Sequence, residues 1–197
     1  MKDTKDKPMY IYGIGNNPII YLYTDASFDV YKDSKSHSGM SVFIGETGGA
    51  IHSASCKQKL ITRSSTEAEI VSAVDALSLG QYYKDFLDEI GISTQVVHYE
   101  DNMSCISLVE TGCYSYDKKD RAIVRKINLM HEYFDTAENK AQMLYCNTDW
   151  HLRDGMTKDL HGKRFEIHED ILMGHEILAE DMNENNVENE MELENDD

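Results

Sequence analysis

The sequence has few of the residues that stiffen, cross-link or anchor a chain. Its 197 residues include only two prolines, one tryptophan and four cysteines, and no two cysteines form a CxxC pair. The apolar runs are far too short to span a bilayer, and the charged N-terminus lacks the apolar core of a secretory signal. We therefore expect no membrane segment, and we expect reduced core thiols rather than disulfides. The eight histidines are dispersed, and no pair has the spacing of a zinc site.

Basic residues are also scarce, with 19 Lys and Arg against 36 Asp and Glu, for a formal net charge of −17. A nucleic-acid-binding protein is ordinarily basic, so this surplus of acid argues at first against that class. The excess of acidic residues is, however, distributed unevenly along the chain. No Lys or Arg follows Arg164, and the ten acids from Glu176 onward account for −10 of the −17, which leaves −7 for the rest. The total charge therefore excludes no function, and the text from about Met182 predicts a disordered acidic tail.

The apolar periodicity predicts a mixed α/β protein. A Gly48-Gly49 turn signal separates two of the expected strands, and a capping sequence at Ser64 opens a long helix that ends at Gly91. The expected strands cover 19–24, 41–45, 50–56, 95–99 and 143–146, and the expected helices cover 64–90, 103–109 and 123–137, with a final helix beginning in 150–160. The order βββαβα(α)βα predicts a five-stranded mixed sheet with flanking helices.

Four acidic residues fall at the edges of these elements. Asp25 ends the first strand, Glu69 lies in the first turns of the long helix, Asp101 ends the fourth strand and Asp154 opens the last helix. If the first and fourth strands are neighbours, Asp25 and Asp101 emerge side by side at one edge of the sheet. A helix across that sheet brings Glu69 to them, and the last helix adds Asp154.

Converging carboxylates repel one another, so such a cluster costs stability unless a cation fills it. Hard oxygen ligands suit Mg²⁺ or Mn²⁺, which keep several waters and also accept phosphate oxygens. Two such ions about 3.5–4 Å apart stabilise the attacking and leaving oxygens of an in-line phosphoryl displacement. The four acids are therefore candidate ligands of a phosphodiesterase.

The motifs around these acids resemble those of a known family. They read D-A-S from Asp25, S-S-T-E-A-E-I around Glu69, Y-E-D-N-x-x-C-I-S around Asp101 and D-x-x-T-K from Asp154. In this order they are similar to the ribonuclease H domain that ends copia-type LTR retrotransposon polyproteins. The resemblance covers roughly residues 1–174, and its strongest part is the pairing of STEAE with EDN some thirty residues later.

The resemblance implies an RNase H-like fold and two-metal hydrolysis of the RNA strand of an RNA–DNA hybrid, leaving a 3′-hydroxyl and a 5′-phosphate. It implies two Mg²⁺ ions, with Mn²⁺ as a substitute. Asp25 matches the carboxylate expected to bridge both ions, and Glu69, Asp101 and Asp154 match the other three ligands. Glu67 is the weaker alternative to Glu69.

The resemblance also implies a division of the chain. Residues 1–18 match the end of a reverse transcriptase connection, 19–174 the ribonuclease H-like domain, and 175–197 form the acidic tail. The expected partners are an RNA–DNA hybrid and the adjacent reverse transcriptase domain of the parent polyprotein. The expected location is intracellular, in a cytoplasmic virus-like particle, with the nucleus as an alternative.

The last motif departs from the family pattern. The family usually reads L-A-D-x-x-T-K-P-L, whereas this sequence reads L-R-D-G-M-T-K-D-L, with Arg153, Gly155 and Asp159 at the altered positions. These changes make Asp154 the weakest of the four assignments. They also leave an alternative interpretation, in which the domain has lost catalysis and binds nucleic acid or protein. A different metal nuclease or an integrase on the same fold is a third alternative, which the STEAE motif weakens.

Other residues near the motifs have weaker assignments. Glu100 is expected to be structural or exposed, and Cys105 a core thiol. His151 is weighed as a residue lining the cleft, and Trp150 as a core or capping residue. The residues assigned to substrate binding are Lys57, Arg63, Ser64 and Asn102.

Overall fold

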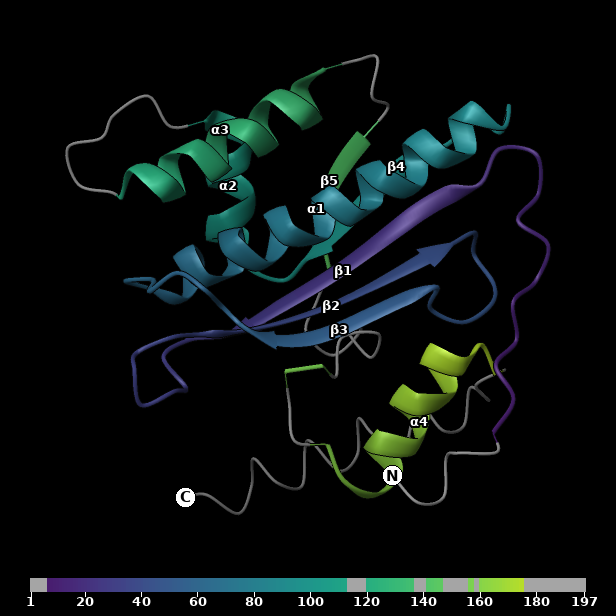
Figure 1. The fold of residues 1–197 in the computed structure, drawn as a ribbon, viewed down its shortest axis with the longest axis horizontal. Helices are drawn as coiled ribbons and strands as arrows, with labels where there is room; N and C mark the ends of the chain where they lie inside the picture. Colours follow the sequence, from purple (N-terminus) through teal and green to yellow (C-terminus); the bar gives the residue numbers. More distant parts are fainter. Residues whose placement is uncertain (1–6, 113–119, 137–140, 147–155, 158–159, 176–197) are drawn as a thin grey trace.

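The protein is described here by a computed structural model, which defines residues 7–112, 120–136, 141–146, 156–157 and 160–175. Within these residues the chain forms five strands and four helices (Figure 1). In chain order they are β1 (Ile19–Ser27), β2 (His37–Ile44), β3 (His52–Lys57), α1 (Ser65–Glu89), β4 (Gln95–Glu100), α2 (Met103–Thr111), α3 (Arg121–Asp135), β5 (Ala141–Tyr145) and α4 (Gly162–Met173). No helix among the described residues combines the length and apolar character that crossing a membrane requires.

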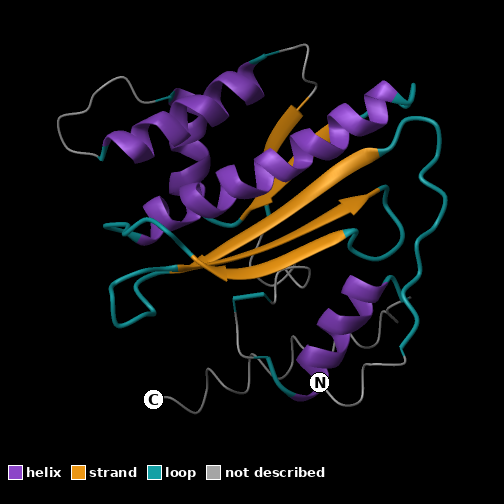
Figure 2. Cartoon of the chain, in the orientation of Figure 1, coloured by secondary structure: helices purple, strands orange, loops and turns teal. Residues whose placement is uncertain are grey.

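The five strands make one mixed sheet in the order β3-β2-β1-β4-β5. β1, β2 and β3 form an antiparallel meander, whereas β4 runs parallel to β1 and β5 runs parallel to β4. The predicted five-stranded mixed sheet and the order of its elements are therefore confirmed. Because β4 is the neighbour of β1, the carboxyl ends of these two strands meet at the same edge of the sheet (Figure 2).

Helices cover both faces of the sheet. α1, α2 and α3 lie on one face, and α4 lies on the other (Figure 1). The alternation of side chains along β1 explains this, because successive residues of a strand point to opposite faces. Ile20 and Leu22 join the core cluster that contains α1 and α3, while Tyr23 joins the cluster that contains Ile167 and Ile171 of α4.

Helix α1 fits its sequence at both ends and at its closest approach to the sheet. The side chain of Ser64 accepts a hydrogen bond from the backbone N–H of Glu67, as the capping sequence predicts. Gly91 follows the helix with a positive φ of 85°, a conformation that favours glycine. At Gly80 a Cβ would lie 2.8 Å from Cδ1 of Leu22, so the absence of a side chain lets the helix pack directly on β1.

Two of the predicted boundaries were wrong in informative ways. β2 begins at His37 rather than near residue 41, because residues 37–40 also pair with β1 on one side and β3 on the other. The final helix begins at Gly162 rather than in 150–160. Of that predicted span the structure describes Met156, Thr157 and Leu160, none of which is helical. The carbonyl groups of Met156 and Thr157 accept hydrogen bonds from serine side chains of the sheet, which competes with helix formation.

The cysteines differ in their surroundings. Cys56, Cys105 and Cys146 form no disulfide within the described residues, and of these three only Cys105 is buried. Cys113, Trp150 and His151 lie outside the described residues. The predicted core thiol is thus found at Cys105, whereas Cys56 is exposed.

Candidate metal centre

Asp25 is positioned by the pairing of β1 with β2 and by a hydrogen bond from α1. Its backbone lies opposite Gly39 of β2, and its carbonyl oxygen accepts a hydrogen bond of 3.1 Å from the hydroxyl of Ser72 on α1. The same hydroxyl lies 3.2 Å from the carbonyl oxygen of Gly39, so α1 is fixed against both strands at this level. The residue as a whole is 8% exposed. β1 continues to Ser27, so Asp25 lies within the strand rather than at its end.

Glu69 and Glu67, two residues apart near the start of α1, point to different sides of the helix. A backbone N–H of Arg63 donates a 2.8 Å hydrogen bond to Oε2 of Glu67, so Glu67 belongs to the helix cap. Glu69 is 5% exposed and faces the carboxylate of Asp25. The structure thus brings together the glutamate that the sequence assigned to the site and leaves its alternative outside it.

Asp101 follows β4, and Asn102 caps the next helix. The side-chain Oδ1 of Asn102 accepts a 3.0 Å hydrogen bond from the backbone N–H of Cys105 at the start of α2. This cap makes the chain turn directly after the strand, so Asp101 stays at the sheet edge beside β1. The role of Asn102 that the structure shows is therefore helix capping.

The three acids converge as their placement in the sequence predicted. One carboxylate oxygen from each of Asp25, Glu69 and Asp101 lies within 4.8 Å of the others. These ligands come from β1, α1 and the end of β4, which are distant in sequence but adjacent in the fold (Figure 1). Asp154, the fourth predicted ligand, lies outside the described residues.

The electrostatics of this cluster are unfavourable for a protein without a bound cation. Burial, together with the charges of Glu100, Asp25 and Asp101, raises the pKa of Glu69 to about 10. Burial, together with the three carboxylates Glu100, Glu69 and Asp101, also raises the pKa of the Cys105 thiol. Cys105 is therefore a neutral thiol beneath the cluster and has no nucleophilic role there.

The donor set fits a hard divalent cation. All three side chains offer carboxylate oxygens, which Mg²⁺ and Mn²⁺ prefer. Oε2 of Glu69 is buried and has no hydrogen-bond partner among the described residues, although a buried polar atom is ordinarily satisfied. A cation at this point would complete the coordination of that oxygen and favour the ionised form of Glu69. The residues present therefore fit the metal that the sequence predicted.

Glu100 is a buried carboxyl group whose position sequence reasoning left open. Its side chain is fully buried, and its Oε1 accepts a 3.1 Å hydrogen bond from the backbone N–H of Asn102. The hydroxyl of Thr24 lies 3.4 Å from Oε2 of Glu100 and 2.8 Å from Nε2 of His98. Burial raises the pKa of Glu100, the hydrogen bond from Asn102 opposes this and the charge of Asp101 adds to it, so that the pKa lies at about 8. The period of two along β4 would have identified it, because His98 and Glu100 share the face of buried Val96.

Thr157 is a second contributor that the sequence did not single out. Its hydroxyl donates a hydrogen bond to Oδ2 of Asp25. Thr157 belongs to the D-x-x-T-K motif, in which it follows Asp154 by three residues. The hydrogen bond joins residues 132 apart in sequence, so no local pattern predicts it.

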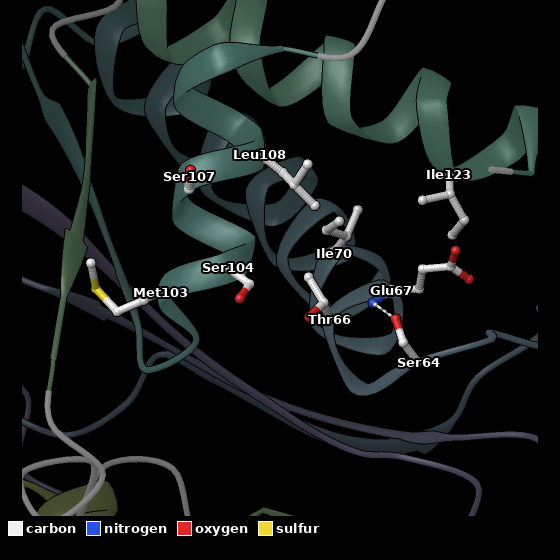
Figure 3. Close-up of a pocket in the computed structure, with 9 residues that line it drawn as sticks. All are labelled: Ser64, Thr66, Glu67, Ile70, Met103, Ser104, Ser107, Leu108 and Ile123. Carbon is white, nitrogen blue, oxygen red and sulfur yellow. Dashed lines mark hydrogen bonds between the residues drawn. The ribbon is translucent and has the colours of Figure 1, made fainter. Parts of the chain in front are cut away.

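A hollow of about 510 Å³ lies between α1, α2 and the start of α3 (Figure 3). It is bounded by the first turns of α1, α2 and α3, whose N-terminal N–H groups carry partial positive charge. Ile70 and Leu108 contribute apolar surface, and Glu67 lies at one side (Figure 3). Its hydroxyl-bearing residues are Ser64, Thr66, Ser104 and Ser107.

Of the four residues assigned to substrate binding, only Ser64 lines this hollow. Ser64 lines it and also caps α1, and Arg63 precedes it as an exposed side chain. Lys57 lies at the end of β3, where its ammonium is 2.7 Å from the carboxylate of Asp33 and 4.6 Å from the centre of the Tyr31 ring. Within the described residues, Lys57 therefore has structural partners and lies apart from the hollow.

Comparisons with known proteins give related chains and folds. No protein-family model matches the sequence. The Retrovirus-related Pol polyprotein from transposon TNT 1-94 of Nicotiana tabacum is 28% identical over 162 residues, which cover 82% of this chain and 12% of that relative. This chain therefore matches only a small part of the length of the polyprotein.

Solved structures with similar folds are ribonucleases H. LC11-RNase H1, solved in complex with an RNA/DNA hybrid, has a TM-score of 0.51 at 16% identity, covering 70% of this chain and 92% of that chain. RNase H1 of Halobacterium salinarum NRC-1 has a TM-score of 0.47 at 11% identity, covering 71% and 93% respectively. At these identities the first of the two likenesses establishes the fold. Together with the tobacco relative it confirms the predicted resemblance: the chain has a ribonuclease H-like fold and is similar in sequence to part of a retrotransposon Pol polyprotein.

Proposed function

We propose that the chain is a metal-dependent nuclease that hydrolyses the RNA strand of an RNA–DNA hybrid. The observation that carries this proposal is the convergence of Asp25, Glu69 and Asp101, with an unsatisfied buried oxygen on Glu69. The cluster is costly for folding, since burial and mutual repulsion both oppose its ionisation. A protein whose acids serve only as caps or solvated side chains has no need of this arrangement.

The three carboxylates would hold Mg²⁺, with Mn²⁺ as a substitute, and Asp154 would be a fourth ligand. When bound, a pair of such ions stabilises the attacking and leaving oxygens of a phosphoryl displacement. Asp25, Glu69 and Asp101 would each contribute a carboxylate oxygen to hold these ions. Thr157, which follows Asp154 by three residues in the same motif, donates a hydrogen bond to Asp25, and this contact supports the proposal that Asp154 is a ligand.

The hollow lined by α1, α2 and α3 is suited to a part of the substrate backbone. Three helix N-termini and four hydroxyl side chains offer donors to phosphate and sugar oxygens. Arg63 and Ser64 lie at its entrance from the α1 side, and Asn102 stands between Asp101 and α2. We assign these residues to substrate binding; Lys57 remains a weaker candidate because of its pairing with Asp33.

The hybrid is the substrate that the similarities favour. LC11-RNase H1 was solved with an RNA/DNA hybrid, and this chain shares its fold. The tobacco relative is a transposon Pol polyprotein, which favours a role in reverse transcription beside a polymerase domain. We further propose the copia type for the parent element, products with a 3′-hydroxyl and a 5′-phosphate, and action in a cytoplasmic particle or in the nucleus.

The test is cleavage of a labelled RNA–DNA hybrid with Mg²⁺ or Mn²⁺ and with EDTA. We expect metal-dependent cleavage of the RNA strand and none of duplex DNA. Asp101→Asn should abolish it, while Glu110→Gln, which changes an exposed acid on α2, should not. If Asp101→Asn cleaves at the wild-type rate, the metal assignment is wrong.

The alternative is a catalytically decayed domain that binds nucleic acid or protein. The observation in its favour is the altered sequence around Asp154, with Arg153, Gly155 and Asp159 in place of the family pattern. Wild-type protein that binds Mn²⁺ and hybrid but cleaves no RNA with either metal would establish this alternative.

A further inference from the structure

A row of three residues crosses the sheet next to the metal site. In the strand register, Asp25 of β1 lies opposite Gly39 of β2, and Gly39 lies opposite Ser55 of β3. Residues that pair across strands point to the same face of a sheet. The middle position has no side chain, and Met156 and Thr157 occupy the space above it. A Cβ on Gly39 would be 2.8 Å from Cβ of Met156 and 2.8 Å from Cγ2 of Thr157.

The segment 156–157 is tied to the row at both ends. The hydroxyl of Ser55 donates a 2.7 Å hydrogen bond to the carbonyl oxygen of Met156. On the other side of Gly39, the hydroxyl of Thr157 donates to the carboxylate of Asp25, and Ser27 approaches the Thr157 carbonyl oxygen at 3.4 Å. The sheet therefore holds the backbone of residues 156–157, and the side chain of Thr157 holds the Asp25 carboxylate.

Ser55 is itself oriented by two more residues. Nε2 of His37 lies 2.7 Å from the Ser55 hydroxyl, and Nδ1 of His37 lies 2.7 Å from the Tyr31 hydroxyl. Ser55 has one proton, which it gives to Met156, so it accepts its hydrogen bond from Nε2–H of His37. Nδ1 of a neutral His37 is then an acceptor, and Tyr31 donates to it. The hydrogen bonds run in one direction, from Tyr31 through His37 and Ser55 to Met156.

Tyr31, at the start of this series of hydrogen bonds, is itself held by further contacts. The ammonium group of Lys57 lies over the Tyr31 ring, a geometry that favours cation–π attraction, and it pairs with Asp33. The loop closes on itself through the backbone hydrogen bond from Ser34 to the carbonyl oxygen of Tyr31. The side chains of Tyr31, His37 and Ser55 therefore connect the loop between β1 and β2 to the backbone of Met156, more than a hundred residues later.

We propose that Tyr31, His37 and Ser55 are positioning residues of the metal site. They seat the segment 156–157 on Gly39, and through Thr157 they fix the orientation of the Asp25 carboxylate. Fixed orientation matters because the loss of a partner that orients a ligating carboxylate typically costs about 10–100-fold in metal affinity or activity. The inference rests on the proposed function, since it assigns Asp25 as a ligand.

The decisive variants change Ser55 and leave the ligands untouched. Ser55→Ala removes the donor to Met156, and Ser55→Thr retains a hydroxyl there. Ser53→Ala is the matched control, because Ser53 is exposed on the same strand and the same face. Gly39→Ala is an independent variant, since its methyl group would displace the segment without removing any side-chain hydrogen bond.

Two measurements on the full-length protein are needed. Amide hydrogen exchange in EDTA compares peptides that contain 156–157 with peptides of α1. Calorimetric titration then gives the affinity for Mn²⁺. For Ser55→Ala and Gly39→Ala we expect faster exchange in 156–157 with unchanged α1, and about a tenfold loss of Mn²⁺ affinity. Ser55→Thr and Ser53→Ala should behave as the unsubstituted protein.

The outcomes separate this inference from the proposed function. Wild-type exchange and affinity in Ser55→Ala would overturn the inference, and so would an equal increase of exchange in α1, which indicates a general loss of stability. If the unsubstituted protein binds no Mn²⁺, the proposed function is wrong. The exchange comparison then still decides whether Ser55 seats the segment.

Discussion

The two ends of β1 show how differently one strand can be used. Towards its start, Ile20 and Leu22 are fully buried against α1 and the neighbouring strands. Towards its end, Thr24 and Asp25 are buried beside other polar groups. Burial of the apolar pair stabilises the fold, whereas burial of carboxylates opposes folding until a cation is bound. Stability and function are thus separated along a single strand, over a few residues.

The sharpest test of the acidic end compares two glutamates of α1. Glu69→Gln should reduce hybrid cleavage by orders of magnitude, because it removes a charged ligand beside the reacting phosphate. Glu67→Gln should keep most of the activity, because Gln retains an oxygen that accepts the hydrogen bond from Arg63. The measurement is steady-state cleavage of both variants under identical metal concentrations. The reverse ranking would move the ligand to Glu67 and shift the helix register.

At the apolar end, Leu22→Ala should cost about 2–5 kcal/mol of unfolding free energy, the usual range for a truncation that leaves a cavity. Urea unfolding in EDTA measures this cost. In the same buffer near neutral pH, Glu69→Gln should raise the melting temperature, because the neutral amide removes the free-energy cost of keeping this carboxyl group protonated in the fold. A destabilised Glu69→Gln protein would contradict the proposed difference between the two ends.

The metal-free protein should become less stable as the pH rises. The pKa of Glu69 is raised to about 10 and that of Glu100 to about 8, so the folded state keeps protons that the unfolded state releases near pH 4.5. Stability therefore falls from about pH 4.5 to about pH 8 through both groups, and on to about pH 10 through Glu69 alone. Melting temperatures in EDTA at pH 5.5, 7.0 and 8.5 (roughly spanning this window) measure the slope.

Controls for the pH series follow from the same reasoning. Glu69→Gln should flatten the slope, and Mg²⁺ should reduce it by binding the ionised carboxylates. A slope that is absent, or that rises with pH, would show that the two carboxyl groups are not held protonated.

The smallest expected effect concerns the acidic tail. Nucleic-acid affinity depends largely on Lys and Arg, and this chain carries a formal charge of −17. Deleting residues from Met182 onward removes seven acids, so we expect a modest gain of hybrid affinity at low salt and a nearly unchanged melting temperature. Affinities of both forms at two salt concentrations test this. Weaker binding after truncation, or loss of the fold, would contradict a purely repulsive tail.

The sequence predicted those parts of the site that depend on local patterns. Asp25 and Asp101 follow apolar strand segments, and Glu69 follows a capping signal, so their positions could be predicted from periodicity and motif order. The convergence of the three then required only that β1 and β4 be neighbours, which the structure confirms. Asp154 stays a prediction, because it lies outside the described residues.

The features that the sequence did not predict depend on long-range contacts. The burial of Glu100 follows from its packing beside Thr24, and the role of Thr157 follows from a contact with a strand at the opposite end of the chain. The final helix was predicted too early for the same reason. The carbonyl groups of Met156 and Thr157 bind serines of β1 and β3, and sequence periodicity carries no information about such partners.

The parallel pairing of β4 with β1 has a consequence for the time at which the site is formed. Asp25 and Glu69 precede the Gly91–Ser93 connection, whereas Asp101 follows it and reaches the site only when β4 has been inserted beside β1. A nascent chain that stops before residue 101 therefore holds two of the three carboxylates and no complete cation site. If the protein is divided within this connection, neither fragment holds all three carboxylates, and we expect metal binding only when the two fragments reassemble. The connection is therefore a suitable point at which to split the protein into a complementation pair.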